Sequence, residues 1–127
     1  MGLTKGIHHV AIKTYGKEEY EKTVAFYRDI LGMTVYRDWG TGIMMLTGES
    51  RMEIMNTGEE RLPQGVLRHV AFLTDDVDAC IDAVRKAGYE ITAEPYDVTI
   101  NAEQPYPLRV AFCIGPAGEE IEFFTEK

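Results

Sequence analysis

The 127-residue sequence has no long apolar run, only two cysteines and no surplus of positive charge. No segment approaches the length of a membrane helix, and the start MGLTKGIHHV lacks the apolar core of a signal peptide, so we expect a cytoplasmic protein without a membrane partner. A formal net charge of −8 argues against the basic stripe that a nucleic-acid surface requires. Cys80 and Cys113 lie in apolar patterns that are typical of small buried hydrophobic residues.

The composition and length suit one ordinary domain, since 45% of the residues are hydrophobic and the chain is long enough to bury a core. Apolar periodicity predicts a strand, a helix and three more strands, and then the same order again. The first helix is predicted to end at Gly32; the second is predicted to be capped by Asp75 or Asp76 and to end at Gly88. The predicted strands cover residues 6–13, 33–39, 42–48, 51–56, 67–74, 89–95, 108–115 and 119–126.

The two halves match beyond their order of elements. HVAIKT (9–14) and HVAFLT (69–74) are sixty residues apart, and Glu53 and Glu122 are each the third residue of the last strand, in RMEIMN and EIEFFT. The second half is nine residues longer between these points, and we assign the excess to a polar loop over 96–107, of a length that is usually functional or mobile. The sequence therefore predicts an α+β fold in which residues 1–127 form a single domain, with βαβββ modules at about 6–56 and 67–127 and a linker at about 57–66.

Alternation along the strands places the histidines and the glutamates on one face of the sheets, and the opposite face is apolar. Burying such polar groups without partners is costly, and a bound divalent cation removes that cost. The candidate ligands are His9, Glu53, His69 and Glu122, whereas His8 is predicted to face the helices. Nickel, zinc, cobalt, manganese or iron suits such a set, and four protein ligands leave an octahedral metal two open positions for substrate.

These residues resemble the vicinal oxygen chelate superfamily, which includes glyoxalase I, bleomycin resistance proteins and extradiol dioxygenases. The matching segments are IHHVAI and FYRDILGM in the first half, and LRHVAF, VDACIDAVRKAGYEI and GPAGEEIEFF in the second. The resemblance implies sheets that curl around a metal-centred cavity, the four ligands named above and a homodimer. It leaves open whether one metal site is built within one chain or across two.

Glyoxalase I is the member whose ligand set is most similar, because epimerases of the superfamily usually have glutamine where this chain has Glu53. The resemblance implies isomerisation of a hemithioacetal, formed from a 2-oxoaldehyde and a thiol, through an enediolate that the metal stabilises. Glu122 is the predicted proton-transfer base and Glu53 the second candidate. The alternatives are an epimerase that acts next to an acyl thioester and a non-catalytic protein that binds a small molecule or an antibiotic.

The thiol cosubstrate is not identified by the resemblance. Glyoxalase I commonly has an arginine four residues after the first ligand and an asparagine four residues after the second, whereas this chain has Lys13 in the first place and Asn56 only three residues after Glu53. Substrate contacts are predicted from positive charge and from shared strand faces. The candidates are Lys13, Arg51, Met55, Arg109 and Phe124.

Overall fold

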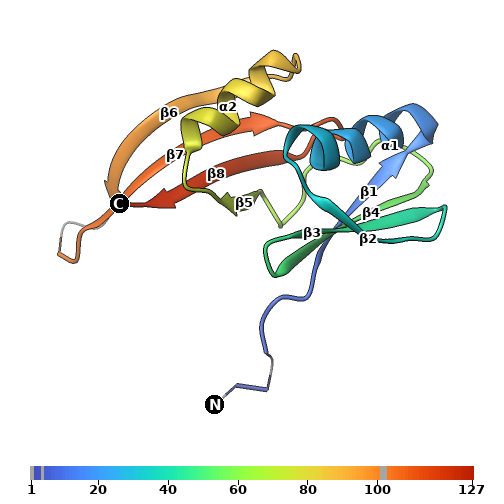
Figure 1. Cartoon of the computed structure of the whole chain (residues 1–127), viewed down its shortest axis with the longest axis horizontal. Helices are drawn as coiled ribbons and strands as arrows, with labels where there is room; N and C mark the ends of the chain where they lie inside the picture. Colours follow the sequence, from blue (N-terminus) through green and yellow to red (C-terminus); the bar gives the residue numbers. More distant parts are fainter. Residues whose placement is uncertain (1, 4, 101–102) are drawn as a thin grey trace. The chain divides into compact units, whose positions relative to one another are not determined.

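A computed structural model describes residues 2–3, 5–100 and 103–127. Over these residues the chain forms eight strands in two four-stranded sheets, two α-helices and one π-helical segment (Figure 1). The contacts divide the chain into two units, Met1–Leu62 and Pro63–Lys127. Each unit has the order strand, helix, strand, strand, strand, so the predicted α+β class and the repeated βαβββ order are confirmed.

In the first unit the strand order is β1-β4-β3-β2, and β1 and β4 run parallel while the other pairs are antiparallel. The strands are β1 (Val10–Tyr15), β2 (Thr34–Asp38), β3 (Gly42–Thr47) and β4 (Ser50–Gly58). The helix α1 (Gly16–Ala25) packs on β1 and β4 and continues into the π-helical segment η1 (Phe26–Ile30). It ends as predicted at Gly32, whose φ of 78° is a left-handed conformation that favours glycine.

In the second unit the strand order is β5-β8-β7-β6, again with one parallel pair, β5 and β8. The elements are β5 (Val70–Leu73), α2 (Val77–Lys86), β6 (Ile91–Ile100), β7 (Tyr106–Ile114) and β8 (Glu120–Glu126). The carboxylate of Asp76 accepts a hydrogen bond from the amide of Ala79 at 2.9 Å and caps α2, as one of the two predicted caps. Figure 1 shows α2 over β6, β7 and β8, which it contacts.

The cores follow the predicted alternation. In β4, Met52 and Ile54 are buried while Glu53 is only partly so, and in β8 Ile121 and Phe123 are buried on the side that packs against α2. One face of each sheet is therefore closed by its own helix. Glu53 and Glu122 lie between these apolar positions and belong to the opposite face, where the histidines and glutamates were predicted, and Glu122 is itself buried there.

The prediction of a loop over 96–107 is largely wrong. Most of it is a β-hairpin, since β6 extends to Ile100 and pairs with β7 from Ile100↔Tyr106 through Tyr96↔Val110. The polar composition and two prolines suggested a loop, but ladder pairing along the edge strand β6 overrides that local signal. Residues 101 and 102 of this segment lie outside the described residues. The described residues include no helix with the length and apolar character needed to span a membrane.

Candidate functional site

The first histidine–glutamate pair joins the residue before β1 to the middle of β4. Ala11 lies opposite Glu53 in the parallel ladder, so the chain that enters β1 passes beside Glu53. The Nε2 atom of His9 lies 3.5 Å from Oε1 of Glu53. The first unit therefore brings this predicted pair together.

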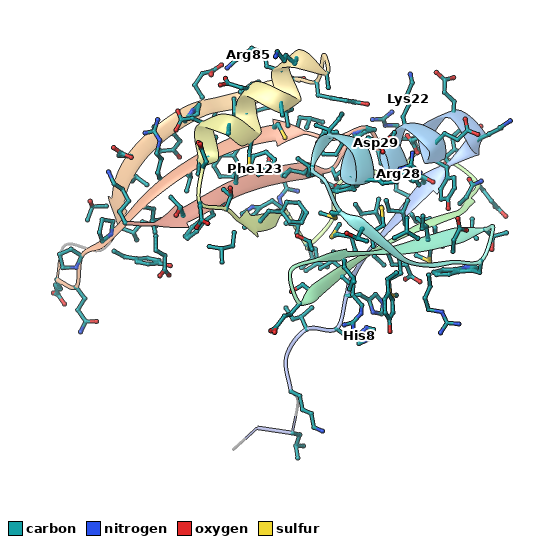
Figure 2. All side chains as sticks on the ribbon, viewed as in Figure 1. His8, Lys22, Arg28, Asp29, Arg85 and Phe123 are labelled. Carbon is teal, nitrogen blue, oxygen red and sulfur yellow. The ribbon has the colours of Figure 1, made fainter. Side chains whose placement is uncertain are left out.

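His8 does not face the helices as predicted. It is exposed, its Nδ1 lies 2.9 Å from Nδ1 of His9, and the two rings meet edge to face with centroids 5.2 Å apart. Figure 2 shows His8 in the N-terminal segment that leads to β1. Because β1 begins only at Val10, strand alternation does not determine the direction of the side chain at position 8.

The second pair repeats the first. Ala71 lies opposite Glu122 in the parallel ladder of β5 and β8, which is the same register as Ala11 and Glu53. The Nε2 atom of His69 lies 3.1 Å from Oε1 of Glu122. The internal repeat therefore extends to the register of the strands and to the ring nitrogen that meets the carboxylate.

The two carboxylates differ in their surroundings. The Glu122 side chain is 11% exposed, and this burial raises the pKa of its carboxyl above the ordinary value; the nearby Glu120 acts in the same direction, and His69 opposes the shift. Glu122 is therefore a stronger base than an ordinary glutamate. The Glu53 side chain is more open, with 18% of it exposed.

Each pair has the spacing of two ligands on one metal ion. Two donor atoms about 2.0–2.2 Å from a metal, at a bond angle of roughly 90–110°, are about 2.8–3.6 Å apart, and the observed separations are 3.5 and 3.1 Å. The imidazole and carboxylate donors suit borderline divalent metals. In the described part of the chain, no three His, Cys, Asp or Glu side chains are gathered so that they could hold a metal ion, so each unit offers a pair of ligands and not a complete site.

Three candidate substrate contacts share the face of Glu53. Met55 follows Glu53 by two residues in β4 and lies opposite Lys13 of β1. Arg51 precedes Glu53 by two residues, and its Cζ lies 4.9 Å from the centroid of the Tyr36 ring in a cation–π contact. Its Nε is buried and has no hydrogen-bond partner among the described residues. Two cations and a thioether thus share a sheet face with Glu53.

Arg109 lies elsewhere. It pairs with Thr125 in the ladder, on the face of β8 opposite to Glu122, and its guanidinium contacts Asp78 of α2 at 2.8 Å and Asp97 of β6 at 3.1 Å. These carboxylates raise the pKa of Arg109, and the hydrogen bond from Arg109 lowers the pKa of Asp78. Arg109 is therefore held on the helix side of the sheet and is not part of the face that carries the second pair.

Phe124 is on the predicted face, two residues after Glu122, with its ring centroid 6.3 Å from that of Tyr106. Two further neighbours of the second pair were not predicted. Glu120 Oε1 lies 3.7 Å from Nδ1 of His69, and the Phe112 ring meets the His69 ring edge to face at 5.8 Å. Glu120 has a sequence signal, because in EIEFFT it alternates onto the face of Glu122.

Comparisons with known proteins identify the family of the chain. The family model described as glyoxalase/bleomycin resistance protein/dioxygenase superfamily matches residues 6–123. The chain is 30% identical to lactoylglutathione lyase of Haemophilus influenzae over 121 residues, which cover 86% of each chain. It is also 30% identical to YaeR of Escherichia coli K12, described as uncharacterized, over 138 aligned positions that cover 99% of each chain.

Solved structures share the fold. A glyoxalase family protein from Enterococcus faecalis superposes with a TM-score of 0.69 at 23% identity, covering 95% of this chain and 98% of that one. A glyoxalase/bleomycin resistance protein/dioxygenase from Alicyclobacillus acidocaldarius gives the same TM-score at 16% identity, covering 94% and 90%. At such low identity these likenesses establish the fold alone.

Proposed function

Since the chain belongs to the glyoxalase/bleomycin resistance protein/dioxygenase superfamily, we propose that it is a metal-dependent lyase or isomerase of the glyoxalase I kind. Its substrate would be a hemithioacetal of a 2-oxoaldehyde and a thiol, or a similar small carbonyl compound. The observation that carries the proposal is the repeated pair, one imidazole Nε2 facing one carboxylate in each unit at 3.5 and 3.1 Å. The similarity to a lactoylglutathione lyase supports the reaction class.

His9, Glu53, His69 and Glu122 are proposed to hold one divalent ion, with nickel, zinc, cobalt, manganese and iron as the candidates. When bound, such an ion stabilises negative charge on the two neighbouring oxygens of the substrate. Both pairs contribute the same donor types, so removing either histidine removes one of two imidazole ligands. We therefore expect His9→Ala and His69→Ala to lower the metal affinity by similar factors.

Glu122 is the proposed base of the proton transfer. It takes the proton from one carbon of the substrate and returns it to the adjacent carbon, which requires its bond to the metal to loosen during turnover. Glu53 is the second candidate, because it belongs to the equivalent pair of the first unit. If Glu53 is only a ligand, Glu53→Gln lowers the metal affinity but leaves the pH profile of kcat unchanged.

The face around Glu53 favours a substrate with an anionic end. Lys13 and Arg51 are proposed to bind that end, while Met55 and, in the second unit, Phe124 are proposed to contact its apolar part. The protein is further proposed to act as a cytoplasmic homodimer on a small molecule. Light scattering of the purified protein tests the dimer, and a monomer at micromolar concentration would contradict it.

Metal binding is the first test. Metal analysis of the protein as isolated, followed by calorimetry with nickel and zinc, is expected to give one ion per chain and a much weaker site in Glu122→Gln. The matched control is Glu126→Gln, the same substitution at the far end of β8. Absence of metal binding by the wild-type protein, or full affinity in Glu122→Gln, would contradict the proposal.

Turnover is the second test. Hemithioacetals made from methylglyoxal and a panel of thiols should yield thioester, and a chelator should abolish the reaction. Proton exchange into an acyl-CoA in deuterated water without thioester formation would instead identify an epimerase. Saturable binding of a small molecule, without turnover and insensitive to chelators, would identify a binding protein.

A further inference from the structure

The two histidine rings differ in what their second nitrogen meets. In the second unit Nε2 of His69 faces Glu122 at 3.1 Å and Nδ1 faces Glu120 at 3.7 Å. In the first unit Nε2 of His9 faces Glu53, and Nδ1 lies 2.9 Å from the ring of His8. A neutral imidazole has one protonated and one unprotonated nitrogen, so the partner of Nδ1 influences which nitrogen keeps a lone pair.

Glu120 is suited to determine this for His69. It is the first residue of β8 and alternates onto the face of Glu122, so the two carboxylates face the two nitrogens of one imidazole ring. The Phe112 ring, 5.8 Å away and edge to face, packs beside it. The ring is thus held by contacts with two strands, β7 and β8.

We propose that Glu120 is a positioning residue: it accepts the Nδ1–H of His69 and thereby keeps the Nε2 lone pair directed to the metal. This inference rests on the proposed function, in which Nε2 of His69 is a metal ligand. The observed 3.7 Å is in the range of an ion pair, and a movement of about 0.5–1 Å brings the two atoms to hydrogen-bond length. The partly exposed Glu120 side chain has room for such a movement.

The first unit has no equivalent carboxylate. Arg51, two residues before Glu53, is the counterpart of Glu120 in the repeat, and a guanidinium is unable to accept a proton from a histidine. Its guanidinium is directed to the Tyr36 ring instead. The two halves of the repeat therefore orient their histidines differently, and an effect of Glu120 has to come from the second unit alone.

Zinc calorimetry and histidine NMR test this inference on the full chain. Glu120→Ala should weaken zinc binding by about 10-fold or more, while Glu120→Gln, which keeps an oxygen acceptor, should lose no more than about 3-fold. Glu126→Gln, about 20 Å along the same strand, should bind as the wild type does. In ¹⁵N spectra of the zinc-loaded protein, His69 should carry its proton on Nδ1 in the wild type and show mixed tautomers in Glu120→Ala.

The outcomes separate the inference from the proposed function. Wild-type affinity and an unchanged tautomer in Glu120→Ala would overturn the inference and leave the metal proposal standing. Equal losses in Glu120→Ala and Glu120→Gln would overturn it too, because they would identify a general effect of charge. If the wild type binds no zinc, nickel or other divalent ion, the proposed function fails and the inference fails with it.

Discussion

Glu122→Gln should separate the cost of a buried carboxylate from its use as a ligand. Burial raises the pKa of Glu122, so its ionised form is less stable in the folded chain than in the unfolded chain. The contribution of Glu122 to the folding free energy is therefore most favourable below the unfolded pKa of about 4.3 and becomes less favourable as the pH rises through the folded pKa. Without metal, the neutral glutamine variant should be at least as stable as the wild type near neutral pH, and the difference should vanish in acid.

With metal the order reverses. A ligand at about 100 times its dissociation constant stabilises the folded state by about 2.7 kcal/mol, and an unfolding entropy of about 2.1 cal/mol/K per residue converts this to a rise in Tm of about 10 °C for a chain of this length. If Glu122→Gln weakens binding about 100-fold, the same metal concentration raises its Tm by only about 1–2 °C.

Thermal unfolding followed by circular dichroism measures both effects, in chelator and in excess zinc, with Glu126→Gln as the control. Two results would refute the reasoning. One is a zinc-induced rise in Tm that is as large in Glu122→Gln as in the wild type, and the other is a metal-free variant that is several degrees less stable near neutral pH.

Three further predictions concern residues outside the proposed site. Asp76→Ala removes the cap of α2 and should cost about 1 kcal/mol, or about 4 °C in Tm, whereas Asp76→Asn should cost little; thermal unfolding of both checks this. Burial raises the pKa of Cys113 to about 12, so a thiol reagent near pH 8 should label at most one thiol of the native chain and both after unfolding. Arg109 lowers the pKa of Asp78, and Lys127 together with Arg109 lowers the pKa of Asp97, so this pairing stabilises the fold above about pH 4 and is lost as the pH falls through the lowered values. In acid titrations Arg109→Gln should therefore unfold at a higher pH than the wild type.

Much of the fold could be predicted from local sequence patterns. The repeat of HVA strands, the glycines at both helix ends and the cap at Asp76 each reflect backbone requirements that few residue types meet. Strand alternation also placed Glu53 and Glu122 on the face opposite Met52, Ile54, Ile121 and Phe123, because a side-chain period of two leaves no other arrangement.

Arg109 shows where alternation fails as a signal. Its strand, LRVAFCIG, is apolar on both faces, so the pattern does not show which face packs against the helix. The ion pair with Asp78 places Arg109 on the helix side, and this pair forms only when α2 packs on the sheet. The segment 96–107 fails for a related reason: its polar composition resembles a loop, and only pairing with β7 makes it a strand.

The sequence by itself determined the order of elements, the internal repeat and the identity of the two histidine–glutamate pairs, because these depend on periods of two and 3.6 residues and on backbone conformations that are written locally. The tertiary structure decided the shared register of Ala11 with Glu53 and Ala71 with Glu122, and which ring nitrogen meets which carboxylate. Contacts between strands far apart in the chain set those features. The same contacts bring Glu120 to the second nitrogen of His69.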